Sequence, residues 1–311
     1  MDENKNDALA IKESASITGF ENRILIVNKL LAQPNELLAH EYFLKAIKCS
    51  KNGNYQGSLE NYTKAIELMP TMIEAYNNRG QLKFERFKDF AGAISDLKKA
   101  VEIRYYYIRP YFNMGMIYRE IRDFENSVKV FNQAIAYTAF PLTIGKTSIS
   151  VYDRMTYDAG LTADIFIQLG ITKAGQNNNE GAVESYSKAI TYDPNHYRAY
   201  YNRAISKGKL NLYTEALSDY SKAIELNPSY ALAFCNRGCL KNNKLNDHNG
   251  AVEDLKKTIE LDPTDTIALN GLGVVNYNLG KINEACEYWK VAISLGNKDF
   301  EDLMKQNLPQ L

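Results

Sequence analysis

The chain repeats itself every 34 positions. Ala182, Tyr186, Ala189 and Pro194 recur, in the same order and at the same spacing, as Ala216, Tyr220, Ala223 and Pro228. A period of this length is typical of stacked supersecondary units, because each unit buries its apolar face against its neighbours. The register predicts seven copies, the second and the sixth with one extra residue at the inner turn. They start near Ala39, Ile73, Ile108, Ala163, Tyr197, Ala231 and Thr266.

Each copy has the pattern of two amphipathic helices. In the fifth copy, Tyr200, Ala204 and Lys207 follow helical spacing, a turn is expected at Asn211, and a second apolar face begins at Ala216. A proline then marks the end of the unit, because the residue before it disfavours the helical region. The closing pairs are Asp193-Pro194, Asn227-Pro228 and Asp262-Pro263.

Small and aromatic residues recur at fixed positions of the repeat. A glycine or alanine in the first helix predicts a close approach of the two helices of a unit. These residues are Gly80, Gly115, Gly170, Ala204, Gly238 and Gly273. The aromatic residues of the second helices are expected to fill the space between neighbouring units. They are Tyr62, Phe131, Tyr186, Tyr220 and Trp289.

With these residues the chain resembles the tetratricopeptide repeat family. The family pattern has an aromatic residue, Leu-Gly and Tyr in the first helix, Ala and an aromatic residue in the second, and a closing proline. It is matched by Tyr111-x2-Met114-Gly115-x2-Tyr118 with Ser127-x3-Phe131, and by Phe166-x2-Leu169-Gly170 with Ala182-x3-Tyr186 and Pro194. The resemblance implies an all-α, right-handed α-solenoid of about seven tetratricopeptide-like helix-turn-helix repeats. An N-terminal helix and a C-terminal capping helix are expected to flank it.

One segment interrupts the period. Ala134 and Ala189 hold equivalent positions but lie further apart than one repeat, which predicts an insert at about 142–162. Its Gly145-Lys146-Thr147 is not a phosphate-binding loop, because Phe140 stands where that loop needs glycine. We expect a connecting loop that leads into a lengthened helix, with a break at Gly160. The predicted divisions are a polar tail and helix (1–38), repeats one to three (39–141), the insert (142–162), repeats four to seven (163–299) and the capping helix (300–311).

Composition excludes several classes of function. The 37 basic and 37 acidic residues cancel, so the chain lacks the positive charge that favours nucleic acid as a partner. The start of the chain is acidic, and Asn28 and Lys29 interrupt its apolar stretch, which predicts neither a signal peptide nor a membrane span. The four cysteines are expected to be reduced thiols, which favours a cytoplasmic location. The sequence leaves the oligomeric state open.

The sequence contains no recognisable catalytic site. It has no nucleophile with a neighbouring base, no paired carboxylates outside ordinary helix surfaces and no glycine-rich loop after a strand. His40, His196 and His248 are scattered, so Cys235 and Cys239 do not complete a metal site. We therefore expect no enzyme activity, no metal and no cofactor.

The inner face formed by the first helices is the predicted binding surface. Such stacks expose this row, and carboxamides interleaved with aromatic rings suit an extended peptide, because an amide both donates to and accepts from a peptide backbone. The alternative is that these amides form hydrogen bonds with helix or loop carbonyls of the neighbouring repeat instead of with a ligand. The predicted groove residues are Asn77, Asn78, Arg109, Phe112, Asn113, Gln168, Arg198, Tyr201, Asn202, Asn236 and Asn270.

These observations predict a scaffold that binds a protein or peptide in the concave groove. Two alternatives stay open: a regulatory receptor for a peptide signal, and a co-chaperone-like adaptor. The resemblance implies that such adaptors grip a carboxylate with a Lys just after the first aromatic residue and an Asn four residues later. No copy has that Lys, and Arg109 and Arg198 supply positive charge without the complete clamp.

Overall fold

The structure is a computed structural model that describes residues 34–138 and 159–297, together with residues 299 and 301. These residues form helices and turns with no strand among them, which confirms the all-α prediction. None of the helices in these ranges is long and apolar enough to cross a membrane. The predicted helix before residue 34, most of the insert and most of the capping helix lie outside the described residues.

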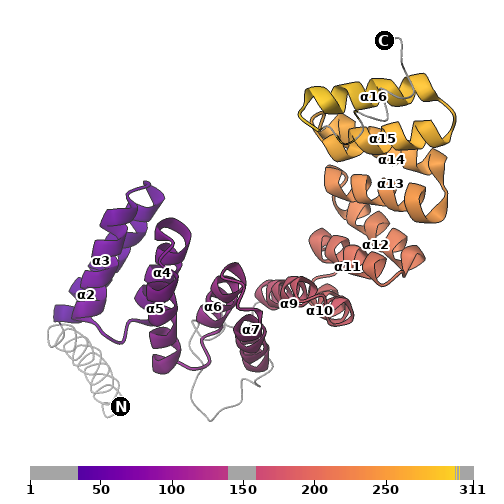
Figure 1. Ribbon diagram of the computed structural model, residues 1–311. Coiled ribbons are helices and arrows are strands. Elements are labelled where there is room, and N and C mark those ends of the chain that lie inside the picture. Colours follow the sequence, from indigo (N-terminus) through magenta and orange to yellow (C-terminus); the bar gives the residue numbers. More distant parts are fainter. Residues whose placement is uncertain (1–33, 139–158, 298, 300, 302–311) are drawn as a thin grey trace, which may run out of the picture. The chain divides into compact units, whose positions relative to one another are not determined.

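The chain divides into two compact units, residues 1–117 and 118–311, which are described separately. In the first unit, α2 packs against α3, α3 against α4 and α4 against α5 (Figure 1). Its helices are α2 (Pro34–Lys51), α3 (Tyr55–Leu68), α4 (Ile73–Leu82), the π-helix η1 (Lys83–Phe87), α5 (Phe90–Ile103) and most of α6 (Ile108–Glu120).

The second unit continues the same alternation. Helices α9 and α10, α11 and α12, α13 and α14, and α15 and α16 form hairpins, and each second helix packs on the first helix of the next hairpin. The helices are α7 (Phe124–Thr138), α9 (Ala159–Gly175), α10 (Asn179–Tyr192), α11 (Tyr197–Lys209), α12 (Tyr213–Leu226), α13 (Ala231–Leu245), α14 (His248–Leu261), α15 (Thr266–Asn278) and α16 (Ile282–Ser294).

Helix α9 is the lengthened helix expected after the insert. It begins at Ala159, ahead of the predicted start of repeat four. Gly160 lies within this helix, and the residues before Ala159, on the other side of the expected break, are outside the described residues. A glycine is tolerated there because the first turn contributes few intrahelical hydrogen bonds.

A residue in the left-handed region turns the chain between the two helices of every repeat. Successive turn residues are 34 or 35 positions apart, except across the insert. They are Gly53, Lys88, Arg122, Asn177, Asn211, Asn246 and Gly280. The turn predicted at Asn211 is therefore confirmed, and the seven predicted repeats each have one such residue. In the second copy the extra residue coincides with the π-helix η1, which is followed by Lys88.

Asn or Asp caps many of the helices that follow these turns. Each cap accepts a hydrogen bond from the backbone N–H three residues on, which satisfies a donor that the helix itself leaves free. The caps are Asn54, Asp89, Asn178 and Asp247. At the other end of the hairpin, Asp193, Asn227 and Asp262 have extended backbone, as expected before proline.

The glycines of the first helices allow the predicted close approach. A Cβ on Gly170 would lie 2.5 Å from the ring of Tyr186, and the indole of Trp289 occupies the equivalent space at Gly273. Both rings therefore pack inside their own hairpin. The expectation that the aromatic residues fill the space between neighbouring units is therefore wrong for Tyr186 and Trp289, whereas Tyr62 and Tyr220 reach Asn78 and Asn236 of the next repeat.

Three buried ion-pair networks join neighbouring repeats, and we call each an Arg–Asp–Lys network. In repeat five, Arg203 Nε and Nη2 donate to Asp219 at 2.8 and 2.7 Å, and Arg203 Nη1 donates to Ser187 Oγ of the preceding repeat at 3.0 Å. Lys207 Nζ lies 2.7 Å from the same carboxylate. The network thus holds three helices together, α10, α11 and α12. The other two networks are Arg79–Asp96–Lys83 with Thr63, and Arg237–Asp254–Lys241 with Ser221.

Candidate functional site

The predicted groove residues all lie on the first helices of their repeats. Within the second unit, α9 contacts α11 and α13 contacts α15, so first helices there also lie beside one another. The residues are distributed as Asn77 and Asn78 on α4, Arg109, Phe112 and Asn113 on α6, Gln168 on α9, Arg198, Tyr201 and Asn202 on α11, Asn236 on α13 and Asn270 on α15.

In the first unit, three of these amides bond to one another. Asn113 Nδ2 donates to Asn77 Oδ1 at 3.0 Å, and Asn77 Nδ2 donates to Asn78 Oδ1 at 3.1 Å. Asn77 is buried, whereas Asn78 and Asn113 are partly exposed. Burial raises the pKa of Tyr62 on α3, and a hydrogen bond from Asn78 opposes that shift. The amides therefore link α3, α4 and α6.

In the second unit, Asn236 forms hydrogen bonds with two tyrosines of the preceding repeat. Its Nδ2 donates to the hydroxyl of Tyr201 at 2.9 Å. Burial raises the pKa of Tyr201 to about 12, with Tyr230 and Cys235 adding to the shift. Burial also raises the pKa of Tyr220, and the hydrogen bond to Asn236 opposes it. This amide thus has a role in the stack, and its role in binding stays a prediction.

Tyr201 belongs to an aromatic cluster that the sequence reasoning identified only in part. The ring of Tyr230 lies edge-on to both Tyr197 and Tyr201, with centroids 5.0 Å apart in each pair. All three rings are partly exposed. Tyr197 is the first residue of α11, and Tyr230 is the residue just before α13. The sequence signal for this cluster was therefore that tyrosines occur near the starts of two successive first helices.

The two predicted arginines are exposed. Arg198 Nε donates to the hydroxyl of its neighbour Tyr197 at 3.1 Å, and the guanidinium lies 5.6 Å from the centre of that ring. Arg109 lies at the start of α6, where its charge opposes the rise that burial causes in the pKa of Tyr107. Arg198 therefore sits at the edge of the tyrosine cluster and leaves part of its charge in solvent.

The remaining predicted residues have varied surroundings. Gln168 accepts a hydrogen bond from Arg119, a partner that the sequence reasoning missed. Asn202 and Phe112 are partly exposed. Asn270 is buried and lines a small cavity of about 150 Å³ together with Cys239 and Val274.

The described residues hold no group of three or more His, Cys, Asp or Glu side chains that could bind a metal ion. Cys235 and Cys239 share a hydrogen bond, which raises the pKa of the buried Cys235 thiol and lowers the pKa of Cys239. A protonated buried thiol is a poor nucleophile, because the thiolate is the reactive form. The surface is thus built from amides, tyrosines and arginines, which bind by hydrogen bonding and stacking.

Family models for the tetratricopeptide repeat match residues 108–139, 197–230 and 231–265, and a further model for this repeat matches residues 174–211. The chain is a tetratricopeptide repeat protein. Three of the matched ranges coincide with the hairpins α6–α7, α11–α12 and α13–α14, and the range 174–211 spans α10 and α11. The repeat supports a role in protein interaction.

Curated relatives match parts of this tetratricopeptide repeat chain. Tetratricopeptide repeat protein 36 homolog of Nematostella vectensis is 37% identical over 65 residues, which are 21% of this chain and 35% of that protein. Hsp70-Hsp90 organizing protein 3 of Arabidopsis thaliana is 28% identical over 186 residues, which are 53% of this chain and 32% of that protein. The chain therefore spans about a third of the length of these relatives.

Solved structures share the fold at low sequence identity. A tetratricopeptide repeat protein from Parabacteroides merdae has a TM-score of 0.58 at 15% identity, over 88% of this chain and 98% of that one. PilF of Pseudomonas aeruginosa has a TM-score of 0.60 at 16% identity, over 76% of this chain and 96% of that one. These similarities show the fold alone, because one fold can bind many unrelated partners.

Proposed function

We propose that the chain is a non-catalytic scaffold whose first helices bind an extended peptide or a segment of a partner protein. The observation that carries the proposal is the partly exposed cluster of Tyr197, Tyr201 and Tyr230 beside the exposed Arg198. Tyrosine rings give a rigid surface for apolar side chains, while amides and a guanidinium bind backbone or acidic groups. Asn202 on the same helix offers both a donor and an acceptor.

The proposal places the protein in a reducing compartment, as the cytoplasm is. The four cysteines are free, and Cys235 and Cys286 are buried. Paired thiols are the rule for small secreted domains, whereas free buried cysteines are common in reducing compartments. Protein is the favoured partner over nucleic acid, because the net charge is zero.

A binding measurement on a double variant tests the groove. A partner would be captured from the source cells with the wild-type chain, and its affinity measured by calorimetry for wild type and for Asn202→Ala with Asn236→Ala. Two lost hydrogen bonds at about 0.5 to 1.5 kcal/mol each predict an affinity lower by roughly one to two powers of ten. Lys222→Ala on α12 is the control and should bind normally. Unchanged affinity with a melting temperature several degrees lower would assign both amides to the stack and overturn the groove.

A co-chaperone-like adaptor is the second candidate, since relatives include Hsp70-Hsp90 organizing protein 3 and stress-induced-phosphoprotein 1 of Caenorhabditis elegans. Arg109 and Arg198 are two of the exposed cations on the first helices, and both lie near the start of their helix. A peptide with a free acidic C-terminus and the same peptide with an amidated terminus separate the two candidates. Equal affinity for both peptides favours the general groove over carboxylate capture.

A further inference from the structure

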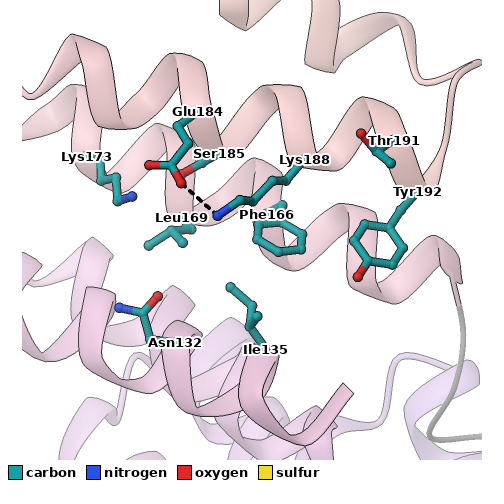
Figure 2. Close-up of a pocket in the computed structure, with 10 residues that line it drawn as sticks. All are labelled: Asn132, Ile135, Phe166, Leu169, Lys173, Glu184, Ser185, Lys188, Thr191 and Tyr192. Atoms are coloured by element: carbon teal, nitrogen blue, oxygen red, sulfur yellow. Dashed lines mark hydrogen bonds and ion pairs between the residues drawn. The ribbon is translucent and has the colours of Figure 1, made fainter. Parts of the chain in front are cut away.

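A cavity of about 530 Å³ lies in the second unit, between the third and fourth repeats (Figure 2). Helix α7 forms one wall, α10 forms the other, and α9 lies between them. None of the predicted groove residues lines this cavity. It is therefore a separate feature from the surface discussed above.

The cavity occupies the place that an Arg–Asp–Lys network fills at other junctions. Leu169 holds the repeat position of Arg203, and Ser185 holds that of Asp219. Asn132 holds the position of Ser187 across the insert. The guanidinium and the carboxylate that occupy a regular junction are thus both replaced by shorter side chains here, which leaves the space open.

One charge of the network is retained without its carboxylate. Lys173 holds the repeat position of Lys207, whose ammonium lies 2.7 Å from Asp219. In the part of the chain that the structure describes, Lys173 has no ion pair of its own; Glu184 on the same cavity pairs with Lys188, and the charge of Lys173 helps to lower the pKa of that carboxyl from a greater distance. Ser185 does not replace the carboxylate, because its hydroxyl, which donates to the carbonyl of Gly181 at 2.8 Å, carries no negative charge. A partly buried ammonium in this position favours an anion beside it.

The floor of the cavity is apolar and aromatic. Phe166 and Leu169 are buried within it, and the ring of Tyr192 stacks on Phe166 with centroids 5.6 Å apart. Lys188 lies 5.9 Å from the centre of the Phe166 ring, and its ammonium pairs with Glu184 at 2.7 Å on the rim. The walls thus combine one available cation with a surface for apolar groups.

We propose that this cavity binds a carboxylate carried on an apolar group. The carboxylate takes the place of the missing aspartate beside Lys173, and the apolar group packs on Phe166 and Leu169. Such a group occurs both in a small aryl carboxylate and in an acidic peptide side chain next to an aromatic residue. The shared chemistry is the same, and two probes separate the sources.

The first probe is 3-phenylpropionate, titrated into the full chain and followed by amide chemical shifts in NMR spectra. A ligand of this size is expected to bind with a Kd on the order of 1 to 10 mM, with shifts in α9 and α10. The uncharged 3-phenylpropionamide should bind at least about tenfold more weakly, since a charge-assisted contact is lost. Equal binding of the acid and the amide, or no binding of the acid, refutes the proposal.

Variants of the cavity residues test whether the acid binds at this position. Lys173→Met keeps most of the length of the side chain and removes its charge, and it should weaken binding of the acid about tenfold. Lys222→Met is the matched control, because Lys222 holds the repeat position of Lys188 at a junction that the network fills. Leu169→Arg with Ser185→Asp installs that network and should abolish binding in a folded chain. Undiminished binding by both the Lys173 variant and the double variant places the acid elsewhere and overturns the assignment.

The second probe is the peptide acetyl-Gly-Phe-Glu-Gly-amide, compared with its Gln counterpart. Preference for the Glu peptide supports the cavity as a site for a protein segment. Binding of 3-phenylpropionate with rejection of both peptides supports the same cavity as a site for a small free acid. Either result depends on Lys173, which keeps this test distinct from the groove experiment on Asn202 and Asn236.

Discussion

Removing Asp219 is expected to destabilise the repeat stack far more than removing an exposed carboxylate. The Asp219 side chain is only 6% exposed and accepts two hydrogen bonds from Arg203 and one close ion pair from Lys207. In Asp219→Ala, both cations keep their positions between α11 and α12 and lose their counterion. Breaking a buried pair in this way costs about 3 to 5 kcal/mol, because an uncompensated charge is left behind.

The matched control breaks an ion pair on the same helix. Lys222 and Glu225 lie 2.6 Å apart, but their side chains are 39% and 67% exposed. Glu225→Ala is expected to change the free energy of unfolding little, since solvent already screens the pair. A second comparison replaces the network itself. Arg203→Met with Asp219→Val introduces Met and Val, which Met114 and Val130 supply at these positions in repeat three, and should cost much less than Asp219→Ala.

Urea unfolding followed by circular dichroism measures these differences, and hydrogen exchange shows where they act. Each repeat contacts mainly its neighbours, so the loss of protection in Asp219→Ala should be greatest in α10, α11 and α12. The reasoning is refuted if Asp219→Ala and Glu225→Ala lower the unfolding free energy equally. It is also refuted if the double replacement is as unstable as the single one.

Three further predictions concern packing, the end of the stack and alkaline pH. Ala223→Leu should cost about 1 to 3 kcal/mol in thermal melts, because Ala223 is fully buried, whereas Lys222→Gln should be nearly silent. Removal of residues 297–311 should lower the melting temperature, since Val291 on α16 is 46% exposed and offers a face for a cap; an unchanged melting temperature would show that no cap exists. Burial raises the pKa of Tyr201 from 10.0 to about 12, so the unfolded state loses its proton first and stability falls between these pH values. Tyr201→Phe should reduce that loss in urea titrations at pH 9 and pH 12.

The period predicted the helical hairpins, because the spacing of apolar and small residues within each repeat determines where its two helices form and pack together. The register placed the turn at Asn211 and the close approach at Gly170, and both are present. The π-helix η1 was not predicted. An extra residue can be absorbed by a bulge, by a longer helix or by a longer turn, and helical periodicity alone does not distinguish these outcomes.

The networks escaped the sequence reasoning for a different reason. Arg203 and Lys207 fit the spacing of an ordinary helix surface, and Asp219 fits the next helix equally well. Only the packing of three helices brings them together. A signal was present nonetheless, because an Arg, a Lys one helical turn later and an Asp at a fixed position of the following helix recur in three copies.

The groove shows the limit of arguing from residue type alone. Carboxamides suit both a peptide ligand and a neighbouring helix, and the register places them where either is within reach. Asn236 bonds to Tyr201, and Asn113 bonds to Asn77, so these amides contribute to the stack. The exposed rim of Tyr197 and Arg198 depends on how α11 meets α13, which the sequence pattern does not specify.

Residues of this sequence are matched across the junction between two repeats, where the second helix of one repeat packs on the first helix of the next. An arginine occurs in a first helix where the preceding second helix offers a hydroxyl, as Ser187 does for Arg203. Where the preceding residue is instead Lys98 or Lys256, the arginine position holds Met114 or Leu272. A lysine there would place a second cation against the guanidinium, so an apolar residue is the compatible choice. Repeats are therefore matched to their neighbours. At the junction before Leu169, where Asn132 faces the leucine and no lysine takes the place of the hydroxyl, the missing groups leave a cavity large enough for a ligand.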